Sequence, residues 1–354
     1  MKAWAVVEAN APLEEIQLPT PVPKGSEVLI EVTHCGVCHS DVHFWKGEYN
    51  MGGGKVMKLS DRGVTLPRAP GHEIAGRAVA LGPDATGVEA GRTYVVYPWL
   101  GCGHCKECTA EQDNMCSAQH SIGVIEHGGF ATHVLVPHPR YLVDPGAVDP
   151  ALAATYACSG ITVYSAIRKV LPLETDRPVV LIGAGGLGLT AIAMLRALEH
   201  QTIISVDIDP VKRAAASAAG ATATVDGTGD DLARRIIDAA GGPVPAVIDF
   251  VNSSATARAG FDALGKGGRL ILVGVSGGEI TLSLAGMVFR ANAVVASLTG
   301  SPQDLREVLA LANSGKLPPT PITTCPRSEA NAALEAVRSG KVTGRLVLAT
   351  DEIE

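Results

Sequence analysis

The pattern of apolar and polar positions changes about halfway along the chain. Up to about residue 155, short apolar runs are separated by glycine and proline. Such runs are typical of β-strands joined by turns. This part is therefore predicted to be a compact, mostly β unit, with strands at Glu27 to Thr33, Ile74 to Leu81, Tyr94 to Tyr97 and Ala131 to Val136.

From about Thr162, apolar runs alternate with alanine-rich stretches of helical periodicity. Helices are expected at Gly188 to Glu199 and at Lys212 to Ala219. This alternation favours a doubly wound parallel sheet with crossover connections. The expected strands are Val179 to Gly183, Thr202 to Asp207, Thr222 to Val225, Ala246 to Val251, Arg269 to Val275 and Val294 to Leu298.

The end of the chain is too short to form a third domain. After about Ser301 it shows two helical segments and a last strand at Gly344 to Leu348, which we expect to return to the first unit. The predicted fold class is α/β, with one domain formed by residues 1–159 and 298–354 and a second formed by residues 160–297.

Composition and charge exclude several classes of function. The length of 354 residues suits about two domains. A net charge of −7 disfavours a nucleic-acid-binding surface, which would normally be basic. No apolar run approaches the roughly 18 residues of a membrane span, and the N-terminus lacks a secretory signal. We expect a cytoplasmic protein with no nucleic-acid or membrane partner.

A glycine motif predicts a dinucleotide site. Residues 179–188 read VVLIGAGGLG, where Gly183, Gly185 and Gly188 form G-x-G-x-x-G between a strand and a helix. Glycine here permits a tight turn, close approach of a pyrophosphate and close helix–sheet packing. Asp207 ends the next strand, where a carboxylate binds ribose hydroxyls and repels a 2′-phosphate. NAD is therefore favoured over NADP, and a glycine-rich turn with a capping aspartate is the alternative.

Four of the eight cysteines lie within one short loop. The spacing C-x2-C-x2-C-x7-C is formed by Cys102, Cys105, Cys108 and Cys116. Four thiolates in one loop suit a closed tetrahedral zinc site with a structural role. His104 and His120 are alternative ligands, and an iron–sulfur cluster or a disulfide is a competing interpretation.

A second set of metal ligands is scattered along the chain. Cys38, His72 and Cys158 lie in the segments CGVCHSDVH, GHEIAG and ACSGITVYSA. A single buried cysteine is usually only a small core residue. Together, however, two thiolates and one imidazole would leave a fourth position open, which is the arrangement of a catalytic zinc ion.

These segments, in this order along nearly the whole chain, resemble those of the zinc-dependent medium-chain alcohol dehydrogenases. The resemblance implies a GroES-like, mostly β catalytic domain and a Rossmann domain, with a cleft between them. It makes Cys38, His72 and Cys158 the ligands of a catalytic zinc ion, so two zinc ions are expected per subunit. The implied reaction is hydride transfer between an alcohol and NAD, which gives an aldehyde or a ketone.

The resemblance also assigns roles to residues near the catalytic zinc. Glu73 would be the acid that assists ligand exchange, and Asp41 would orient His72. Ser40 and His43 would form a proton relay, with His43 titrating near the ordinary histidine pKa.

Cofactor and substrate contacts are expected on the same basis. The nicotinamide would be lined by Thr162, Val273 and Val275. Contacts to the pyrophosphate, the adenosine ribose and the glycine turn are expected from His39, Arg345, Lys212, Gly186 and Leu187. The chain is poor in aromatics, so the candidates for the substrate pocket, with core packing as the alternative, are Trp45, Tyr49 and Trp99.

The chain departs from the family pattern in two places. The segment between Cys38 and His72 is longer than the usual family loop, and residues 50–63 are expected at the mouth of the substrate cleft. The segment after Cys116 is short, which resembles the tetrameric microbial members. Cys35 and Cys325 match no family role and are interpreted as ordinary thiols.

Other functions are weighed against this one. A polyol or threonine dehydrogenase of the same superfamily is the main alternative, although those relatives often have a carboxylate among the zinc ligands. A regulatory NAD-binding protein on this fold would need no open zinc site. A zinc-stabilised nucleic-acid-binding protein would need a basic surface. The favoured prediction is a homotetrameric NAD-dependent alcohol dehydrogenase of class EC 1.1.1.1.

Overall fold

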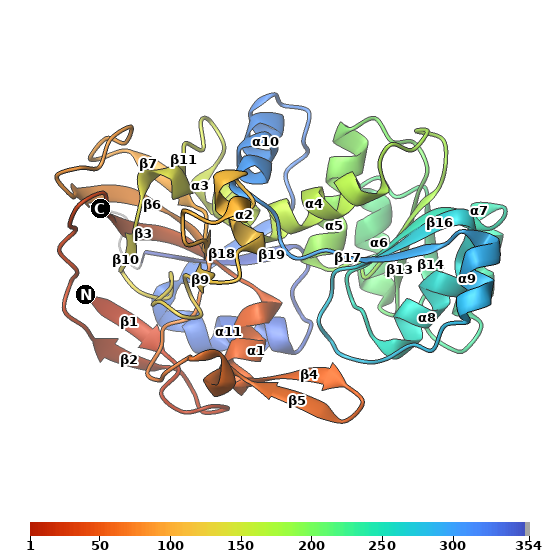
Figure 1. The fold of residues 1–354 in the computed structure, drawn as a ribbon, viewed down its shortest axis with the longest axis horizontal. Helices are drawn as coiled ribbons and strands as arrows, with labels where there is room; N and C mark the ends of the chain where they lie inside the picture. Colours follow the sequence, from red (N-terminus) through yellow and green to blue (C-terminus); the bar gives the residue numbers. More distant parts are fainter. Residues whose placement is uncertain (351–354) are drawn as a thin grey trace.

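Two large sheets, one at each end of the molecule, organise the chain (Figure 1). The structure is a computed structural model that describes residues 1–350. Within these residues one large sheet has seven strands and the other has six. A mostly β domain thus lies beside a doubly wound parallel sheet, and the predicted α/β class is confirmed.

The sheet of the first domain has the order β11-β7-β6-β3-β19-β18, and β10 also pairs with β3. At its centre, β3 (Val28–Val37) and β6 (Glu73–Leu81) are antiparallel neighbours. β19 (Arg345–Ala349) pairs with β3, so the end of the chain returns to this sheet. The other strands here and in two small pairs are β7 (Thr93–Val96), β10 (His133–Val136), β11 (Leu142–Val143), β18 (Ile322–Pro326), β1 (Lys2–Ala5), β2 (Glu14–Gln17), β8 (Trp99–Leu100) and β9 (His120–Ser121).

The second sheet is parallel, in the order β14-β13-β12-β15-β16-β17. The strand order reverses between β12 (Val179–Ile182) and β15 (Val244–Asp249). Ligands of such sheets bind outside the carboxyl ends of the strands at this reversal. The remaining strands are β13 (Ile203–Asp207), β14 (Ala223–Asp226), β16 (Leu264–Leu272) and β17 (Ala293–Ala296).

Helices cover both faces of the parallel sheet, which is why β12 is buried along its whole length. α6 begins earlier than predicted because Asp209 caps it and Pro210 suits its first turn. No helix within residues 1–350 is long and apolar enough to cross a membrane. The helices of this domain are α5 (Gly186–Ala197), α6 (Pro210–Ala218), α7 (Leu232–Ala240), α8 (Ser254–Ala263) and α9 (Leu284–Arg290).

Two connections join the domains. The first runs through α3 (Pro150–Thr155), a π-helical turn at Tyr156–Gly160 and α4 (Ile161–Val170). The second leads from β17 through residues 297–301 to α10 (Pro302–Asn313), which α11 (Ala330–Arg338) follows. We propose these connections as the domain boundaries; residues 351–354 of the predicted return segment lie outside the described residues.

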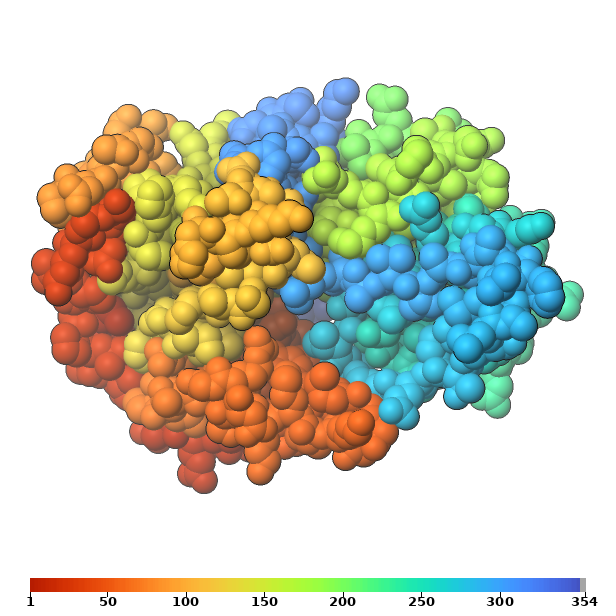
Figure 2. Space-filling view, in the orientation of Figure 1, coloured from red at the N-terminus to blue at the C-terminus, as the bar shows by residue number. Residues whose placement is uncertain are grey.

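The long segment between Cys38 and His72 folds into a hairpin of β4 (Glu48–Gly52) and β5 (Lys55–Lys58), followed by a short 3₁₀ turn. The hairpin reaches the second domain, because a Cβ added to Gly52 would lie 2.5 Å from the carbonyl oxygen of Gly278. Figure 2 shows the molecule hollowed between the domains, with this hairpin along one edge of the hollow. The inserted segment therefore borders the cleft between the domains.

Candidate active site and metal centres

Cys38, His72 and Cys158 meet where the first sheet adjoins the helical connection. Cys38 precedes α1 (His39–Lys46), His72 precedes β6, and Cys158 lies in the π-helical turn. Their ligand atoms all lie within 4.8 Å of one another. The buried Nε2 of His72 has no hydrogen-bond partner among the described residues. An unpartnered imidazole nitrogen beside two thiols fits a zinc ion.

Asp41 holds this ligand set together. Its Oδ1 lies 3.3 Å from Nδ1 of His72 and accepts a hydrogen bond from the Gly71 amide, while its Oδ2 accepts one from the Cys38 amide. Burial alone would lower the pKa of His72, but the Asp41 carboxylate raises it well above the usual value. A hydrogen bond with Cys158 lowers the pKa of the Cys38 thiol. The pocket therefore favours a thiolate at Cys38, and Asp41 fixes the imidazole so that Nε2 faces the metal position.

Glu73 and Arg345 form a buried ion pair behind the metal ligands. Burial raises the pKa of Glu73 to about 7, although Arg345 opposes the rise. The other carboxylate oxygen of Glu73 accepts a hydrogen bond from the Ser159 amide. Arg345 also reaches the start of α5, because a Cβ added to Gly186 would lie 2.6 Å from its Cδ. This pair therefore joins the metal site to the glycine turn.

The glycine turn has the geometry that an anion requires. Gly183 has φ of 98°, a conformation that favours glycine. Gly185 is the residue before α5, and no side chain there bonds to the first amides of the helix. The first amides of α5 are thus available to a phosphate. Asp207 closes the turn, since its Oδ2 accepts a hydrogen bond from the Ala184 amide at 2.8 Å. Gly188 packs against the Gly183 carbonyl, which leaves no room for a side chain.

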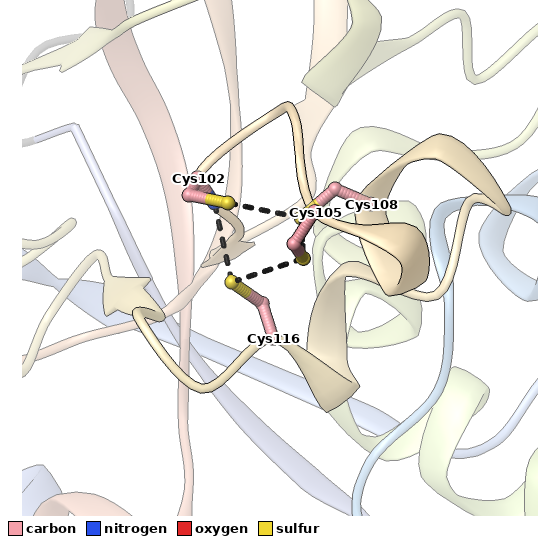
Figure 3. A group of neighbouring side chains, drawn as sticks. All are labelled: Cys102, Cys105, Cys108 and Cys116. Atoms are coloured by element: carbon pink, nitrogen blue, oxygen red, sulfur yellow. Dashed lines mark hydrogen bonds between the residues drawn. The ribbon is translucent and has the colours of Figure 1, made fainter.

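The four cysteines of the loop turn their sulfur atoms toward one another (Figure 3). The Sγ atom of Cys105 lies 3.4 Å from that of Cys108 and 3.8 Å from that of Cys116. The Sγ atoms of Cys102 and Cys108 are 4.0 Å apart. A tetrahedron with Zn–S bonds of about 2.3 Å has edges of about 3.8 Å. The loop therefore fits one zinc ion.

The alternatives for this loop fit less well. An iron–sulfur cluster holds several irons and sulfides between its cysteines, and these sulfur atoms are too close for that. The described cysteines are all free thiols. His104 directs its Nδ1 to the carbonyl of Cys102, and His120 lies exposed beside Glu126. Neither histidine is grouped with the four sulfur atoms.

Sequence reasoning missed a polar cluster that joins Asp113 of the cysteine loop to Arg140 and Tyr141. Asp113, only 1% exposed, accepts hydrogen bonds from Arg140 and from the Tyr141 hydroxyl. It anchors the loop to the segment that precedes β11. No local motif indicates this cluster, because its members come from separate segments.

Comparisons with known proteins agree with this geometry. Residues 24–145 match the alcohol dehydrogenase GroES-like domain, and residues 186–314 match the zinc-binding dehydrogenase domain. An NAD-dependent alcohol dehydrogenase of Sulfurisphaera tokodaii is 36% identical over 98% of this chain and 99% of its own length. A D-arabinose 1-dehydrogenase (NADP(+)) of Saccharolobus solfataricus is 32% identical over 98% of this chain and 97% of its own. The crystal structure of the alcohol dehydrogenase of Aeropyrum pernix superposes with a TM-score of 0.90 at 29% identity, covering 99% of this chain and 100% of that one.

This chain belongs to the zinc-dependent medium-chain alcohol dehydrogenase family.

The zinc-dependent alcohol dehydrogenase fold accounts for both metal centres. Within the described residues, the chain has a three-ligand site with an open position and a closed four-cysteine site. The first is the catalytic zinc site and the second the structural zinc site.

The two residues predicted to form the proton relay of this dehydrogenase, Ser40 and His43, lie on α1. Ser40 is partly exposed, and the ring of His43 stacks on Tyr49 at 4.9 Å and lies 5.3 Å from the ring of His39. Burial, together with the positive charges of His39 and Lys46, lowers the pKa of His43 to about 4. The expectation of an ordinary histidine pKa is therefore wrong, because the β4–β5 hairpin and α1 partly bury this ring.

The three aromatic candidates for the pocket separate in the structure. The ring of Trp99 lies 5.3 Å from that of the ligand His72, and Tyr49 covers His43. Trp45 does not reach the site: its Nε1 donates to the Ala11 carbonyl at 2.6 Å, and its ring packs beside Arg338 of α11. The prediction of Trp45 in the pocket is corrected, since the opposite face of α1 carries it.

The remaining cofactor residues stay predictions. Thr162 is buried in α4, Val273 follows β16 and donates its amide to the Asp249 carbonyl, and Val275 is half exposed. His39 is exposed at the start of α1. Lys212 lies on α6 with its Nζ near Gly340.

Proposed function

We propose that this protein interconverts an alcohol and the corresponding aldehyde or ketone with NAD, as an alcohol dehydrogenase of class EC 1.1.1.1. The observation that carries the proposal is the unpartnered Nε2 of His72, which faces two thiols beside a dinucleotide-type glycine turn. A metal site that lacks a fourth ligand, placed next to a dinucleotide site, is suited to hydride transfer from a metal-activated substrate. The NAD-dependent alcohol dehydrogenase of Sulfurisphaera tokodaii supports this choice of cofactor.

Each residue of the site has a proposed part. When bound, zinc supplies Lewis-acid activation of the alcohol hydroxyl and NAD supplies the hydride acceptor. Asp41 orients the His72 ligand, and the Ser40 hydroxyl passes the alcohol proton toward a ring nitrogen of His43. Glu73 and Arg345 keep the metal site in register with α5.

The cofactor would be NAD because Asp207 ends β13 beside the glycine turn, where its carboxylate would meet the adenosine ribose and repel a 2′-phosphate. Arg213, which could otherwise accept a 2′-phosphate, donates to the carbonyls of Asp207 and Ile208 and pairs with Asp226. The NADP-dependent D-arabinose dehydrogenase among the relatives makes a sugar or polyol substrate the second candidate.

We also propose that the protein is a cytoplasmic homotetramer. The eight free cysteines, seven of them in two metal sets, suit a reducing compartment. Self-association is supported by α9, where Leu284, Val288 and Phe289 are at least 76% exposed beside the edge strand β17. Light scattering on a sizing column would measure the assembly.

The test of the function is an NAD-reduction screen over ethanol, longer primary alcohols, secondary and cyclic alcohols, benzyl alcohol, sorbitol and D-arabinose. His72→Ala serves as the control, because it should abolish turnover and still bind NADH. Turnover of simple alcohols that His72→Ala abolishes supports the proposal. A zinc-loaded protein that oxidises only the sugar would establish the second candidate. One that oxidises nothing and binds NADH would point to the regulatory alternative.

A further inference from the structure

The chain leaves the second domain through a strained segment. Thr299, between β17 and α10, has φ of 43°, which β-branched residues rarely adopt. Its buried hydroxyl has no hydrogen-bond partner within the described residues. A residue in such a conformation persists only where its surroundings impose it. The segment 297–301, here called the crossover, must therefore be held from outside.

Two side chains of the first domain hold the crossover on either side of Thr299. Nδ2 of Asn114 donates to the carbonyl of Leu298 at 2.9 Å, and the hydroxyl of Tyr97 donates to that of Gly300 at 2.7 Å. Asn114 is 7% exposed and Tyr97 is fully buried. The crossover is thus held at the carbonyls of Leu298 and Gly300, which lie on either side of the strained Thr299.

One of the two donors, Asn114, belongs to the structural zinc loop. Asn114 lies between the zinc ligands Cys108 and Cys116, in a single 3₁₀ turn whose position depends on the closed loop. Figure 1 shows the segment that leads from β17 to α10 passing beside α2 (Lys106–Thr109) of this loop. Asn114 therefore links the four-cysteine loop directly to the crossover.

The crossover borders the cofactor cleft. The amide of Ser297 donates to the carbonyl of Leu272 at 2.9 Å, so the crossover begins beside Val273 at the carboxyl ends of β16 and β17. Ligands of doubly wound sheets bind at these ends. Lys169 of α4 holds the hydroxyl of Ser297 from the other side at 3.0 Å. A shift of the crossover would move this wall of the cleft.

We infer that Asn114 is a positioning residue through which the structural zinc loop sets the crossover and, with it, the nicotinamide end of the cofactor cleft. The four-cysteine zinc then acts on cofactor affinity as well as on stability. The cofactor readout rests on the proposed NAD-dependent function, whereas the position of the crossover does not.

The test compares three variants with the wild type. Asn114→Leu removes the amide at similar volume, and Tyr97→Phe removes the second donor from outside the zinc loop. The control is Arg306→Gln, which breaks the 2.7 Å ion pair between Arg306 of α10 and Glu111 of the zinc loop without touching the crossover. Each is assayed for zinc content, hydrogen exchange of residues 297–301, NADH affinity by fluorescence, and the KM values for NAD and alcohol.

We expect Asn114→Leu and Tyr97→Phe to speed exchange in the crossover and to weaken NADH binding roughly fivefold to tenfold, the usual effect of one hydrogen bond. The KM for NAD should rise while the KM for the alcohol changes little. Unchanged exchange and affinity in Asn114→Leu with zinc fully bound, or equal effects in Arg306→Gln, would overturn the inference. If Asn114→Leu loses zinc, Asn114→Ser, a smaller polar replacement that cannot reach the Leu298 carbonyl, takes its place. If the wild type binds no NADH, the proposed NAD-dependent function fails. The hydrogen-exchange comparison of residues 297–301 still tests whether Asn114 positions the crossover.

Discussion

Two histidines of the active site are driven in opposite directions by their surroundings. His72 faces the Asp41 carboxylate, which raises its pKa against the effect of burial, whereas His43 is partly buried beside other cations and its pKa falls to about 4. The motifs identify both residues, but these directions depend on neighbours that only the fold supplies. The same holds for Glu73, whose pKa of about 7 results from its burial.

The low pKa of His43 shifts to lower pH the range in which this side chain can accept a proton. Above about pH 4 His43 is neutral and can accept a proton, and as pH falls through that value it becomes charged and the relay is lost. The acidic limb due to His43 in a pH profile of kcat/KM should therefore lie nearer pH 4 than the ordinary 6.5. His43→Gln should lower alcohol oxidation on the order of ten- to a hundredfold, with partial rescue by added buffer base. An unchanged rate and profile, with zinc fully occupied, would remove His43 from the mechanism.

Asp41→Asn should weaken the catalytic zinc. The change removes the charge that fixes His72, and loss of such a partner typically costs roughly ten- to a hundredfold in metal affinity. Competition with a chromogenic chelator measures this. The control is Asp61→Asn, because Asp61 makes the equivalent backbone bond to the Lys58 amide at an exposed turn. Equal zinc affinity in both variants would contradict the role of Asp41.

Asp207→Ser should narrow the preference for NAD over NADP by about tenfold or more, because the repulsion of a 2′-phosphate disappears. Part of the loss of NAD affinity should come from the turn, since Asp207 also accepts hydrogen bonds from the amides of Ala184 and Asp209. Asp209→Ser is the control, as it changes only the cap of α6. The measurement is the ratio of kcat/KM with NAD to kcat/KM with NADP in each variant. A wild-type enzyme that prefers NADP would refute the assignment of Asp207 as the residue that selects NAD.

At the scale of elements, helical geometry explains the error at Trp45. Successive residues of an α-helix are about 100° apart, so Trp45 points about 200° away from His43. If His43 faces the cleft, Trp45 must face away from it, and it packs against α11. The helical period therefore separates these two residues wherever residues 39–46 form a helix. The contact between the β4–β5 hairpin and the second domain was not available from the sequence, because it joins segments that share no motif.

The hairpin contact can be tested with two glycines of similar conformation. Gly52 has φ of 80° and Gly54 has φ of 73°, so alanine should strain the backbone similarly at both. At Gly52 the new Cβ would also meet the carbonyl of Gly278, whereas at Gly54 it would meet nothing within 4 Å. We expect Gly52→Ala, but not Gly54→Ala, to raise the KM for NAD and alcohol severalfold by holding the cleft open. Indistinguishable kinetics would show that the contact does not affect the cleft.

At the scale of the whole molecule, what could be predicted depends on separation along the chain. The glycine turn and the four-cysteine loop are local, so spacing alone indicates their chemistry. The Asn114–Leu298 bond spans 184 residues and the Arg345–Glu73 pair 272. Such partners carry no local signal, although the resemblance placed Arg345 near the cofactor. The parallel sheet was predictable because apolar strand segments alternate with helical ones, and its central strand β12 is apolar throughout, as burial on both faces requires.

The two zinc sites should differ in lability, because one is closed and the other is open. Four thiolates fill the shell of the structural ion, and Asp113, Arg140 and Tyr141 anchor its loop, so a chelator has no free position to attack. The catalytic site has three protein ligands and faces the cleft, so a chelator can take the fourth position. Metal analysis of fresh protein should therefore find close to two equivalents of zinc.

Brief chelation should remove one equivalent and all turnover while the far-ultraviolet circular dichroism and NADH affinity persist. Longer treatment should remove the second equivalent and lower the melting temperature, because the four-cysteine loop is held closed by its ion. Iron in place of zinc, or loss of both ions in one phase, would contradict this division between the two sites.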